Sequence, residues 1–567
     1  MPANNRYNWM TDILWITLLI SLFYACWLGS YPLFTPDEGR YTEAAREMLA
    51  TGDFITPRVD GIAFLDKPIL YYWLQAAALK LFGIKEWAVR FFPALIGLLG
   101  CLVTYLAGRQ LFDRRTGILS AIILGSSPLY FAGAHYANLD LEVAVFIGSS
   151  LMCVCVAIQR EGFVGLRYLL AAYIFAALAF LTKGMIAIVF PAMIVGLWII
   201  FQWRWNTLRQ LHLATGFIIM SAIALPWYFL EQQVNPEFFH YFFVTQQVTR
   251  FLSGAEFNNK SYAWFYAPVV IAGFFPWVIY LFQALINAIK NVIVSKAAHP
   301  TEMFLLIWII AIFTFFSIPT SKIVGYILPI FPALALLTGR YLSEIWTHPN
   351  FNPMYIAVTI FTILGGLLGI LLLLLPNHHW VSFNVEFTPY IFMMAMTIFI
   401  SVFASLFAMR TQTMLVLFTI CLFCSATLLL TLTKGATHLN SNTAKPLVNI
   451  LKPILKPQDE VVHYYKFYQD VPLYLEKRVT LVANWNDPNI EKNDNWVREL
   501  WYGKFYQSSD AWLISEHSFW KRWNSNKRLF VFLNTSYLSQ FKSHAPYYYV
   551  IGKENNILLL SNQIGLI

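Results

Sequence analysis

The chain has 567 residues, of which 58% are hydrophobic and only 12% are charged, and its mean hydropathy is +0.56. Repeated apolar runs of about twenty residues exclude a soluble globular protein and indicate a polytopic membrane protein, because a helix needs about 20 apolar residues to cross a bilayer. The net charge of +9 is dispersed, which argues against a nucleic-acid binder and suits contact with anionic lipid head groups or phosphorylated substrates.

The apolar runs predict thirteen transmembrane helices. The first run lacks a small-residue cleavage site, so we expect a retained span and not a removed signal peptide. The predicted spans fall near residues 12–30, 88–108, 117–134, 139–158, 168–181, 184–202, 211–230, 264–289, 302–318, 323–339, 354–376, 388–408 and 413–433.

Lysine and arginine residues concentrate in alternate loops, for example Arg109, Arg114 and Arg115 after the second span. The cytoplasmic bias of such residues predicts that the N-terminus is cytoplasmic and that, after an odd number of spans, the polar C-terminal tail is periplasmic. The polar interval 31–87 and the loop 231–263 are then expected on the same periplasmic face.

The interval after the first span holds an unusual concentration of charged residues for so apolar a chain. It contains a helix start, with Thr35 as N-cap, Pro36 at the first helical position and Glu38 closing a capping box. The helix is expected to run to about Leu49, with an apolar face suited to the membrane interface. Asp37 and Glu38 are therefore interpreted either as residues that complement the helix dipole or as active-site residues.

Other polar residues on the expected periplasmic face also have two interpretations. Lys183 and Lys322 are either functional groups or cations that extend from helix ends into the head-group layer. Tyr326 is either a ligand-binding phenol or an interfacial aromatic residue. Arg250 is a candidate ligand or an ordinary loop cation, and Asp140 a candidate ligand or a helix N-terminal residue.

All six cysteines lie within apolar runs. Cys421 and Cys424 have the spacing of a metal or redox pair, but no second pair and no nearby histidine accompany them. We interpret them as small core residues.

The composition changes near residue 434, which predicts a membrane domain over 1–433 and a soluble α/β domain over 434–567. This tail contains no catalytic motif, and the chain has no P-loop, GxGxxG or nucleophile elbow. Strands are expected at 461–465, 479–483, 511–514, 529–533, 547–551 and 557–560, and helices at 443–455, 467–475 and 496–504.

Five motifs together resemble one family. They are P-D-E-G-R-Y-T-E-A-A-R-E-M (36–48), D-K-P-x-L-Y-Y-W (66–73), L-T-K-G (181–184), F-F-P-W (274–277) and S-K-I-V-G-Y-I-L-P (321–329). In order and spacing they are similar to the lipid A aminoarabinose (4-amino-4-deoxy-L-arabinose) transferase family, within the polyprenyl-phosphate-dependent membrane glycosyltransferases related to protein O-mannosyltransferases. The resemblance implies a GT-C type fold with thirteen transmembrane helices, interfacial helices after the first span and a periplasmic C-terminal α/β domain.

The resemblance also implies roles for particular residues. Asp37 and Asp140 correspond to the family's essential acidic residues, and Lys67, Arg250 and Tyr326 would bind the phosphate of the carrier lipid. Further expected substrate-binding residues are Glu38, Asp66 and Lys322.

The chain departs from the family pattern at two places. Many relatives have Glu-Lys-Pro where this chain has Asp66-Lys67-Pro68, and Glu-His where it has Gln246-Gln247. In those relatives the glutamate and histidine resemble zinc ligands. Because this chain has Gln247 in place of the histidine, we expect no metal here, and no cofactor.

The implied function is transfer of a sugar from an undecaprenyl-phosphate donor to lipid A or lipopolysaccharide, at the periplasmic face of the inner membrane. Membrane lipids are expected partners, and nucleic acids are not. Two alternatives are a related transferase acting on protein or another glycan and a polyprenyl-lipid transporter. Charged residues at helix ends and in one-sided loops favour an enzyme, because a transporter would place them near the bilayer midplane.

Overall fold

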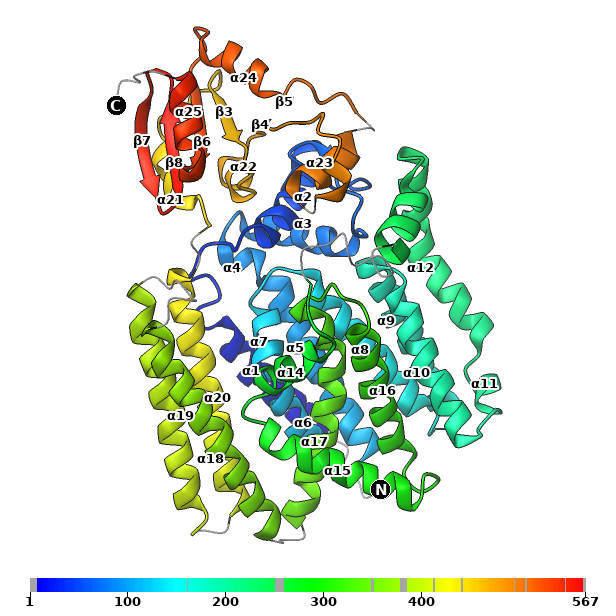
Figure 1. Ribbon diagram of the computed structural model, residues 1–567. Helices are drawn as coiled ribbons and strands as arrows, with labels where there is room; N and C mark the ends of the chain where they lie inside the picture. Colours follow the sequence, from blue (N-terminus) through cyan, green and yellow to red (C-terminus); the bar gives the residue numbers. More distant parts are fainter. Residues whose placement is uncertain are drawn as a thin grey trace. The chain divides into compact units, whose positions relative to one another are not determined.

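The computed structural model describes residues 8–160, 162–249, 260–347, 351–377, 385–410, 413–439, 442–493, 495–504, 507–545 and 547–563. The chain folds as two compact units (Figure 1). The helical unit comprises Met1–Ser30, Arg90–Tyr228 and Asn259–Leu439, and the mixed unit comprises Tyr31–Val89, Phe229–Asn258 and Asn440–Ile567. The polar interval after the first span therefore belongs to the same unit as the C-terminal tail.

The helical unit supplies the membrane-spanning segments. Ten of the described helices are long and apolar enough to cross a membrane, and two bent helix pairs raise the number to twelve. The elements are α1 (Asn8–Ala25), α5 (Phe91–Leu111), α6 (Arg114–Gly125), α7 (Pro128–Ala134), α8 (Leu139–Ala157), α9 (Gly162–Lys183), α10 (Ile186–Gln202), α11 (Thr207–Gln210), α12 (Leu213–Val234), η4 (Ala263–Phe265), α14 (Tyr266–Gly273), α15 (Val278–Val294), α16 (Pro300–Ser317), η5 (Val324–Ile330), α17 (Phe331–Thr347), α18 (Phe351–Leu374), α19 (Thr388–Ala408) and α20 (Met414–Gly435).

The predicted span at 184–202 corresponds to α10, which has 17 residues and is shorter than the other spans. By length the described spans therefore number up to twelve and not thirteen. The prediction of a helical multi-pass membrane protein is nevertheless confirmed.

Proline explains where the two bent pairs break. The helices α6 and α7 meet at 67°, and Pro128 begins α7 while Ser127 before it is extended. This is the conformation that a residue preceding proline prefers. The helices α14 and α15 meet at 117°, and Pro276 lies in the turn between them. Proline cannot donate the helical hydrogen bond that would continue the span.

The helix α8 forms the centre of the helical unit and is buried along its full length. The helices α5 and α9 pack against it, and α6 and α17 pack beside α5. A helix surrounded on all sides has to be apolar on all sides. The sequence of α8 is apolar all round, apart from a few small polar residues and the carboxylates of its first turn.

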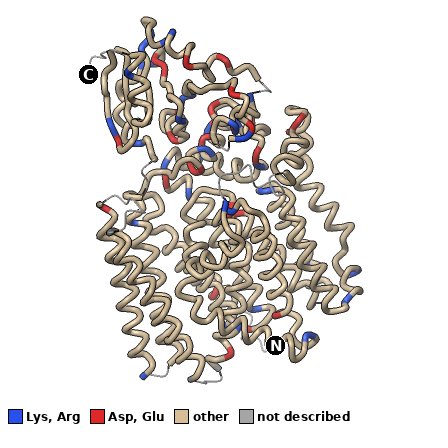
Figure 2. Tube along the Cα trace, viewed as in Figure 1, with Lys and Arg blue, Asp and Glu red and all other residues tan. Residues whose placement is uncertain are grey.

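The helices α18, α19 and α20 lie side by side, with few charged residues along their length (Figures 1 and 2). Their outward side chains, such as Leu367, Ile370 and Phe403, are each more than half exposed in the protein alone. So many exposed large apolar residues indicate a surface that faces lipid.

The mixed unit contains a six-stranded sheet with the order β5-β4-β3-β6-β8-β7. Strands β3 to β6 are parallel, whereas β8 runs antiparallel to β6 and to β7. The described elements are α2 (Asp37–Thr51), β1 (Arg58–Val59), β2 (Ile62–Ala63), α3 (Leu70–Phe82), α4 (Glu86–Val89), η2 (His240–Thr249), α21 (Lys445–Leu451), β3 (Glu460–Tyr464), α22 (Asp470–Leu475), β4 (Thr480–Val482), α23 (Trp496–Lys504), β5 (Leu513–Ile514), α24 (Glu516–Trp523), β6 (Leu529–Asn534), α25 (Leu538–His544), β7 (Tyr549–Glu554) and β8 (Ile557–Ser561).

Each of the six predicted strands corresponds to a strand of this sheet. The central strands β3 and β6 are almost completely buried, as expected for parallel strands covered on both faces. The sequence pattern did not predict α24 and α25, which are only eight and seven residues long.

Buried ion pairs stabilise the start of strand β3. Burial raises the pKa of Asp459, but hydrogen bonds from Arg528 and the backbone of Lys456 outweigh it and leave the pKa below its usual value. Burial acts in the same way on Glu460, and bonds from Lys527 and Arg522 lower its pKa overall. Both carboxylates are therefore ionised in neutral solution.

A second group of acidic residues, on α2 and in the β1–β2 turn, behaves in the opposite way. Glu43 is fully buried, and burial raises its pKa to about 8 although Arg46 donates two hydrogen bonds to it. Burial also raises the pKa of Glu47, which accepts hydrogen bonds from the amide of Gly61. The buried carboxyl of Asp60 accepts a hydrogen bond from the amide of Val479, and burial places its pKa well above the usual range.

We expect Asp459→Asn to weaken the sheet around β3 and β6. Asp459 has 2% of its side chain exposed, so the substitution leaves the Arg528 charge without its carboxylate. Removing one partner of a buried ion pair costs about 3–5 kcal/mol. Hydrogen exchange of the purified full chain should become faster in peptides that cover these two strands. Glu476→Gln, which changes an exposed carboxylate, is the control; equal exchange in both variants would contradict the expectation.

Candidate active site

In the helical unit, the start of α8 positions Asp140. Asn138 is the N-cap residue of this helix, and its side-chain oxygen accepts a hydrogen bond of 3.1 Å from the backbone amide of Asp140. Capping by asparagine fixes the first turn of a helix. The carboxylate of Asp140 consequently has a defined position at the helix N-terminus, where a negative charge is favourable.

Two further residues from other elements meet Asp140. The ammonium group of Lys183, the last residue of α9, forms an ion pair with the carboxylate of Asp140. The same ammonium lies 4.3 Å from the centre of the Tyr326 ring, in the η5 segment. The side chains of Asp140 and Lys183 are only 13% and 14% exposed. The three residues, here called the Asp140 cluster, place a carboxylate, a cation and a phenol together.

Gly325 allows the chain to pass close to this cluster. A Cβ atom at this position would lie 2.2 Å from a carboxylate oxygen of Asp140, so there is no room for a side chain. The hydroxyl of Tyr266 donates a hydrogen bond of 3.1 Å to the carbonyl of Ile323 and fixes the preceding backbone. Segment η5 thus lies directly against the start of α8.

Lys322 has a different environment from Lys183. Its side chain is buried, and its ammonium donates to the backbone carbonyls of Pro319 and Ser261. The cation beside Tyr326 is therefore Lys183. From the sequence, Lys183 could be either a functional group or a cation that extends into the head-group layer. The signal that could have selected it is its place as the one cation between two apolar runs.

In the mixed unit, Asp37 begins α2 and forms an ion pair of 2.7 Å with Arg40. Arg40 also pairs with Glu499 of α23 at 2.5 Å. The carboxylate of Glu38 accepts a hydrogen bond of 2.7 Å from the amide of Phe34. These bonds join the start of α2 to the loop before it and to α23.

The predicted capping box at Thr35 is wrong. Pro36 occupies the N-cap position without a side-chain cap, and the hydroxyl of Thr35 donates to the carbonyl of Asn442 instead. The Glu38 carboxylate still bonds backward, but to Phe34. The apolar face of α2, including Tyr41 and Met48, is buried within the mixed unit. Packing against α3 and α22 accounts for this burial, so membrane insertion is not needed to cover the face.

Asp66 is held by groups from η2. The hydroxyl of Tyr241 donates to it at 2.5 Å, and the amide of Gln246 donates to both Asp66 and Tyr241, at 3.3 and 2.8 Å. Burial, followed by the nearby Asp66 charge, raises the pKa of Tyr241 far above its usual value. The sequence does not single out Tyr241, because five phenylalanines of the same loop give the same signal.

Two predicted phosphate-binding residues remain. Lys67 is half-buried beside Asp66, and Arg250 lies outside the described residues. Within the part of the chain that the structure describes, no three His, Cys, Asp or Glu side chains come together as a metal-binding group.

Comparison of the fold with solved structures defines a class of protein. The chain is similar to ArnT from Cupriavidus metallidurans bound to undecaprenyl phosphate, with a TM-score of 0.84 and 24% identity over 97% of this chain and 98% of that one. It is also similar, with a TM-score of 0.54 and 13% identity, to the Archaeoglobus fulgidus oligosaccharyltransferase over 95% of this chain and 71% of that chain. The fold is therefore that of a GT-C type membrane glycosyltransferase.

Sequence comparison then gives the family. Residues 66–229 match the model of the dolichyl-phosphate-mannose-protein mannosyltransferase family. The undecaprenyl phosphate-alpha-4-amino-4-deoxy-L-arabinose arabinosyl transferase of Yersinia enterocolitica is 30% identical over 66% of this chain and 67% of its own length. The corresponding transferase 2 of Proteus mirabilis is 32% identical over 60% of each chain, so that match spans less than two thirds of the relative. The chain belongs to the family of these arabinosyl transferases.

We expect the interaction between Asp140 and Lys183 to appear in a double-mutant cycle. Lys183→Met removes the charge and leaves a half-buried carboxylate without its cation, so each single variant should lower the unfolding midpoint. The double variant with Asp140→Asn should lose less than the sum, with a coupling of about 0.5–3 kcal/mol. Tryptophan fluorescence of the detergent-purified chain measures this. The control is Lys434→Met, at the exposed end of α20, which should show no coupling to Asp140→Asn. Strict additivity of Lys183→Met and Asp140→Asn would contradict the expectation.

Proposed function

We propose that the chain transfers 4-amino-4-deoxy-L-arabinose from an undecaprenyl-phosphate donor to a phosphate of lipid A, at the periplasmic face of the inner membrane. Family membership supports the donor and the reaction. The structural observation that carries the proposal is the Asp140 cluster, which places a carboxylate, a cation and a phenol at the ends of apolar helices. Such groups at a membrane surface suit a substrate with a charged head and a long apolar chain.

The reaction exchanges one glycosidic bond for another. An oxygen of the acceptor phosphate forms a bond to the anomeric carbon as the bond from that carbon to the carrier phosphate breaks. The leaving phosphate keeps the electron pair and gains negative charge in the transition state. Cations and hydroxyl donors aimed at that charge lower the barrier. We assign this role to Lys67, Arg250 and Tyr326.

The carboxylates have another role in this proposal. A lipid A phosphate is already anionic, so the acceptor needs no strong general base. We assign to Asp37 and Asp140 the orientation of the sugar through its amino group, by charge-assisted hydrogen bonds. Lys183 is then a positioning residue, because its ion pair fixes the carboxylate of Asp140. Glu38, Asp66 and Lys322 are proposed to shape the substrate-binding surface.

The position of the charges argues against a polyprenyl-lipid transporter. Asp140 lies in the first turn of α8 and Lys183 is the last residue of α9, so both are at helix ends. A transporter would be expected to place such groups on broken helices near the bilayer midplane.

Mass spectrometry of lipid A from cells with and without the chain tests the acceptor directly. An unmodified lipid A together with a modified protein or glycan would favour the alternative acceptor.

Asp37→Asn is expected to reduce sugar transfer by at least about 10²-fold while the protein remains folded. The amide keeps the shape of the side chain but loses the charge, and a charge-assisted hydrogen bond is about twice as strong as a neutral one. Losing one preorganised hydrogen-bonding group from the transition state costs about 10²–10³-fold in rate. Transfer from a polyprenyl-phosphate donor extract to lipid A measures activity, and gel filtration in detergent measures folding.

The matched control is Asp510→Asn, which changes an aspartate of the same unit that is 83% exposed and pairs with Lys504. If Asp37 only supports the ion pair with Arg40, its substitution should cost about 1 kcal/mol or less of stability and leave transfer normal. Near-normal transfer by a folded Asp37→Asn variant would remove Asp37 from the proposed site.

The proposed orientation predicts which segments are accessible from the periplasm. An epitope at the C-terminus should be cleaved by protease added to spheroplasts, whereas one inserted between Arg109 and Arg115 should be protected. This follows from the cytoplasmic preference of arginine-rich loops. Cleavage of the arginine-loop epitope, with protection of the C-terminus, would reverse the orientation. Lysis of the spheroplasts, after which both epitopes must be cleaved, is the control.

A further inference from the structure

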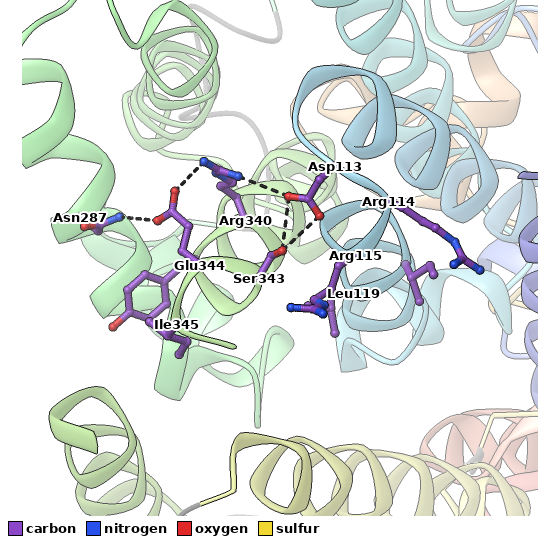
Figure 3. Close-up of a pocket in the computed structure, with 11 residues that line it drawn as sticks. Asp113, Arg114, Arg115, Leu119, Asn287, Arg340, Ser343, Glu344 and Ile345 are labelled. Atoms are coloured by element: carbon purple, nitrogen blue, oxygen red, sulfur yellow. Dashed lines mark hydrogen bonds and ion pairs between the residues drawn. The ribbon is translucent and has the colours of Figure 1, made fainter. Parts of the chain in front are cut away.

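The helical unit has a polar pocket at the other end of its spans from the Asp140 cluster. This pocket has a volume of about 1000 Å³ and is formed by the start of α6, the end of α17 and Asn287 of α15 (Figure 3). Tyr326 and Arg340 belong to one span, and at 1.5 Å per residue they are roughly 20 Å apart along it. The pocket is therefore separate from the groups assigned to sugar transfer.

Most charges around the pocket are already paired. Arg340 contacts Asp113 at 3.3 Å and Glu344 at 2.8 Å, and the hydroxyl of Ser343 donates to Asp113 at 3.1 Å (Figure 3). The Arg114 guanidinium donates hydrogen bonds of 2.6 and 2.8 Å to Asp12 in α1. Arg109 of α5 also contacts Asp12, at 3.5 Å. The three arginines and three carboxylates of these pairs hold α1, α5, α6 and α17 together, and their charges cancel.

Arg115 is the exception among the arginines that line the pocket. Its side chain is exposed, and it forms no ion pair within the described part of the chain. Its guanidinium lies 5.9 Å from the centre of the Trp346 ring. Packing on an aromatic face leaves the N–H groups at the edge of a guanidinium available to an anion. Among the described residues, the pocket thus carries one positive charge that no carboxylate compensates.

The helix α15 indicates that lipid lies next to the pocket. Its side chains Phe282, Ile286, Ile289 and Ile293 recur at helical spacing, and each is between 41% and 78% exposed. The adjacent side of the helix is polar: Gln283 accepts a hydrogen bond from Tyr341, and Asn287 donates one to Glu344. A helix with one apolar stripe that is sharply bent from its neighbour is suited to the boundary between lipid and water.

We propose that this pocket binds the head group of a glycerophospholipid that carries one phosphodiester charge. Arg115 binds the phosphate through paired N–H groups, the geometry in which guanidinium groups prefer to meet phosphate. The apolar residues Ile118 and Ile345 contact the glycerol and the first acyl carbons. The carboxylates of Asp113 and Glu344 in the wall disfavour a second negative charge, so the pocket selects a phosphodiester over a phosphomonoester.

Native mass spectrometry of the full chain, purified in detergent and stripped of lipid, tests the proposal with phosphatidylglycerol as the probe. One bound molecule is expected. Diacylglycerol with the same acyl chains and phosphatidic acid should each bind at least about tenfold more weakly. Inorganic phosphate at equal concentration should not displace the lipid. Displacement by inorganic phosphate, or tighter binding of phosphatidic acid, would overturn the proposal by showing a general anion site.

Variants locate the binding. Arg115→Gln should weaken phosphatidylglycerol binding about tenfold or more, and Ile118→Trp, which fills the pocket without changing charge, should do the same. Lys290→Gln changes another exposed cation, one on α15 outside the pocket, and should leave binding unchanged. Binding that survives both pocket variants, or that falls equally with Lys290→Gln, would overturn the assignment.

Discussion

The ion pair between Asp140 and Lys183 is the interaction on which the polar centre of the helical unit depends. It joins the beginning of α8 to the end of α9, two helices that are apolar almost throughout. A charge at such a position is costly unless an opposite charge accompanies it. Because the lysine also lies over the ring of Tyr326, the same pair determines where η5 can pack. Three segments distant in sequence are therefore positioned by one electrostatic contact.

The sequence predicts the membrane helices and the strands well, because long apolar runs and β-rich segments are local signals. The ends of elements depend on tertiary contacts and are predicted less well. Thr35 has the residue type and spacing of an N-cap, but its hydroxyl is taken by the carbonyl of Asn442, which no local pattern reveals. In the same way, α10 begins at Ile186, later than the predicted span at 184–202.

The candidate site shows a similar limit. Asp37, Asp66 and Asp140 could be selected from motifs, but their partners could not. Lys183 has no neighbour in sequence that pairs it with Asp140, and Tyr241 is one of several aromatic residues in its segment. Pairings across more than forty residues are set by the packing of whole helices. Residue types thus indicate which groups carry the chemistry, and only the fold shows what holds each of them.

The buried acidic residues of the mixed unit have a consequence for its response to pH. Asp459 and Glu460 have lowered pKa values, so their contribution to stability is complete above about pH 4 and is lost in stronger acid. Glu43 and Glu47 have raised pKa values, so the folded chain keeps protons that the unfolded chain releases, and stability falls as the pH rises from about 4 towards 8. The two groups act in opposite directions. His463 of β3 is also buried, and its pKa is lowered to about 3, so stability is lost there too as the pH falls below about 6.5. The mixed unit therefore loses stability on both sides of a middle range: in acid, as Asp459, Glu460 and His463 take up protons, and towards pH 8, as Glu43 releases its proton.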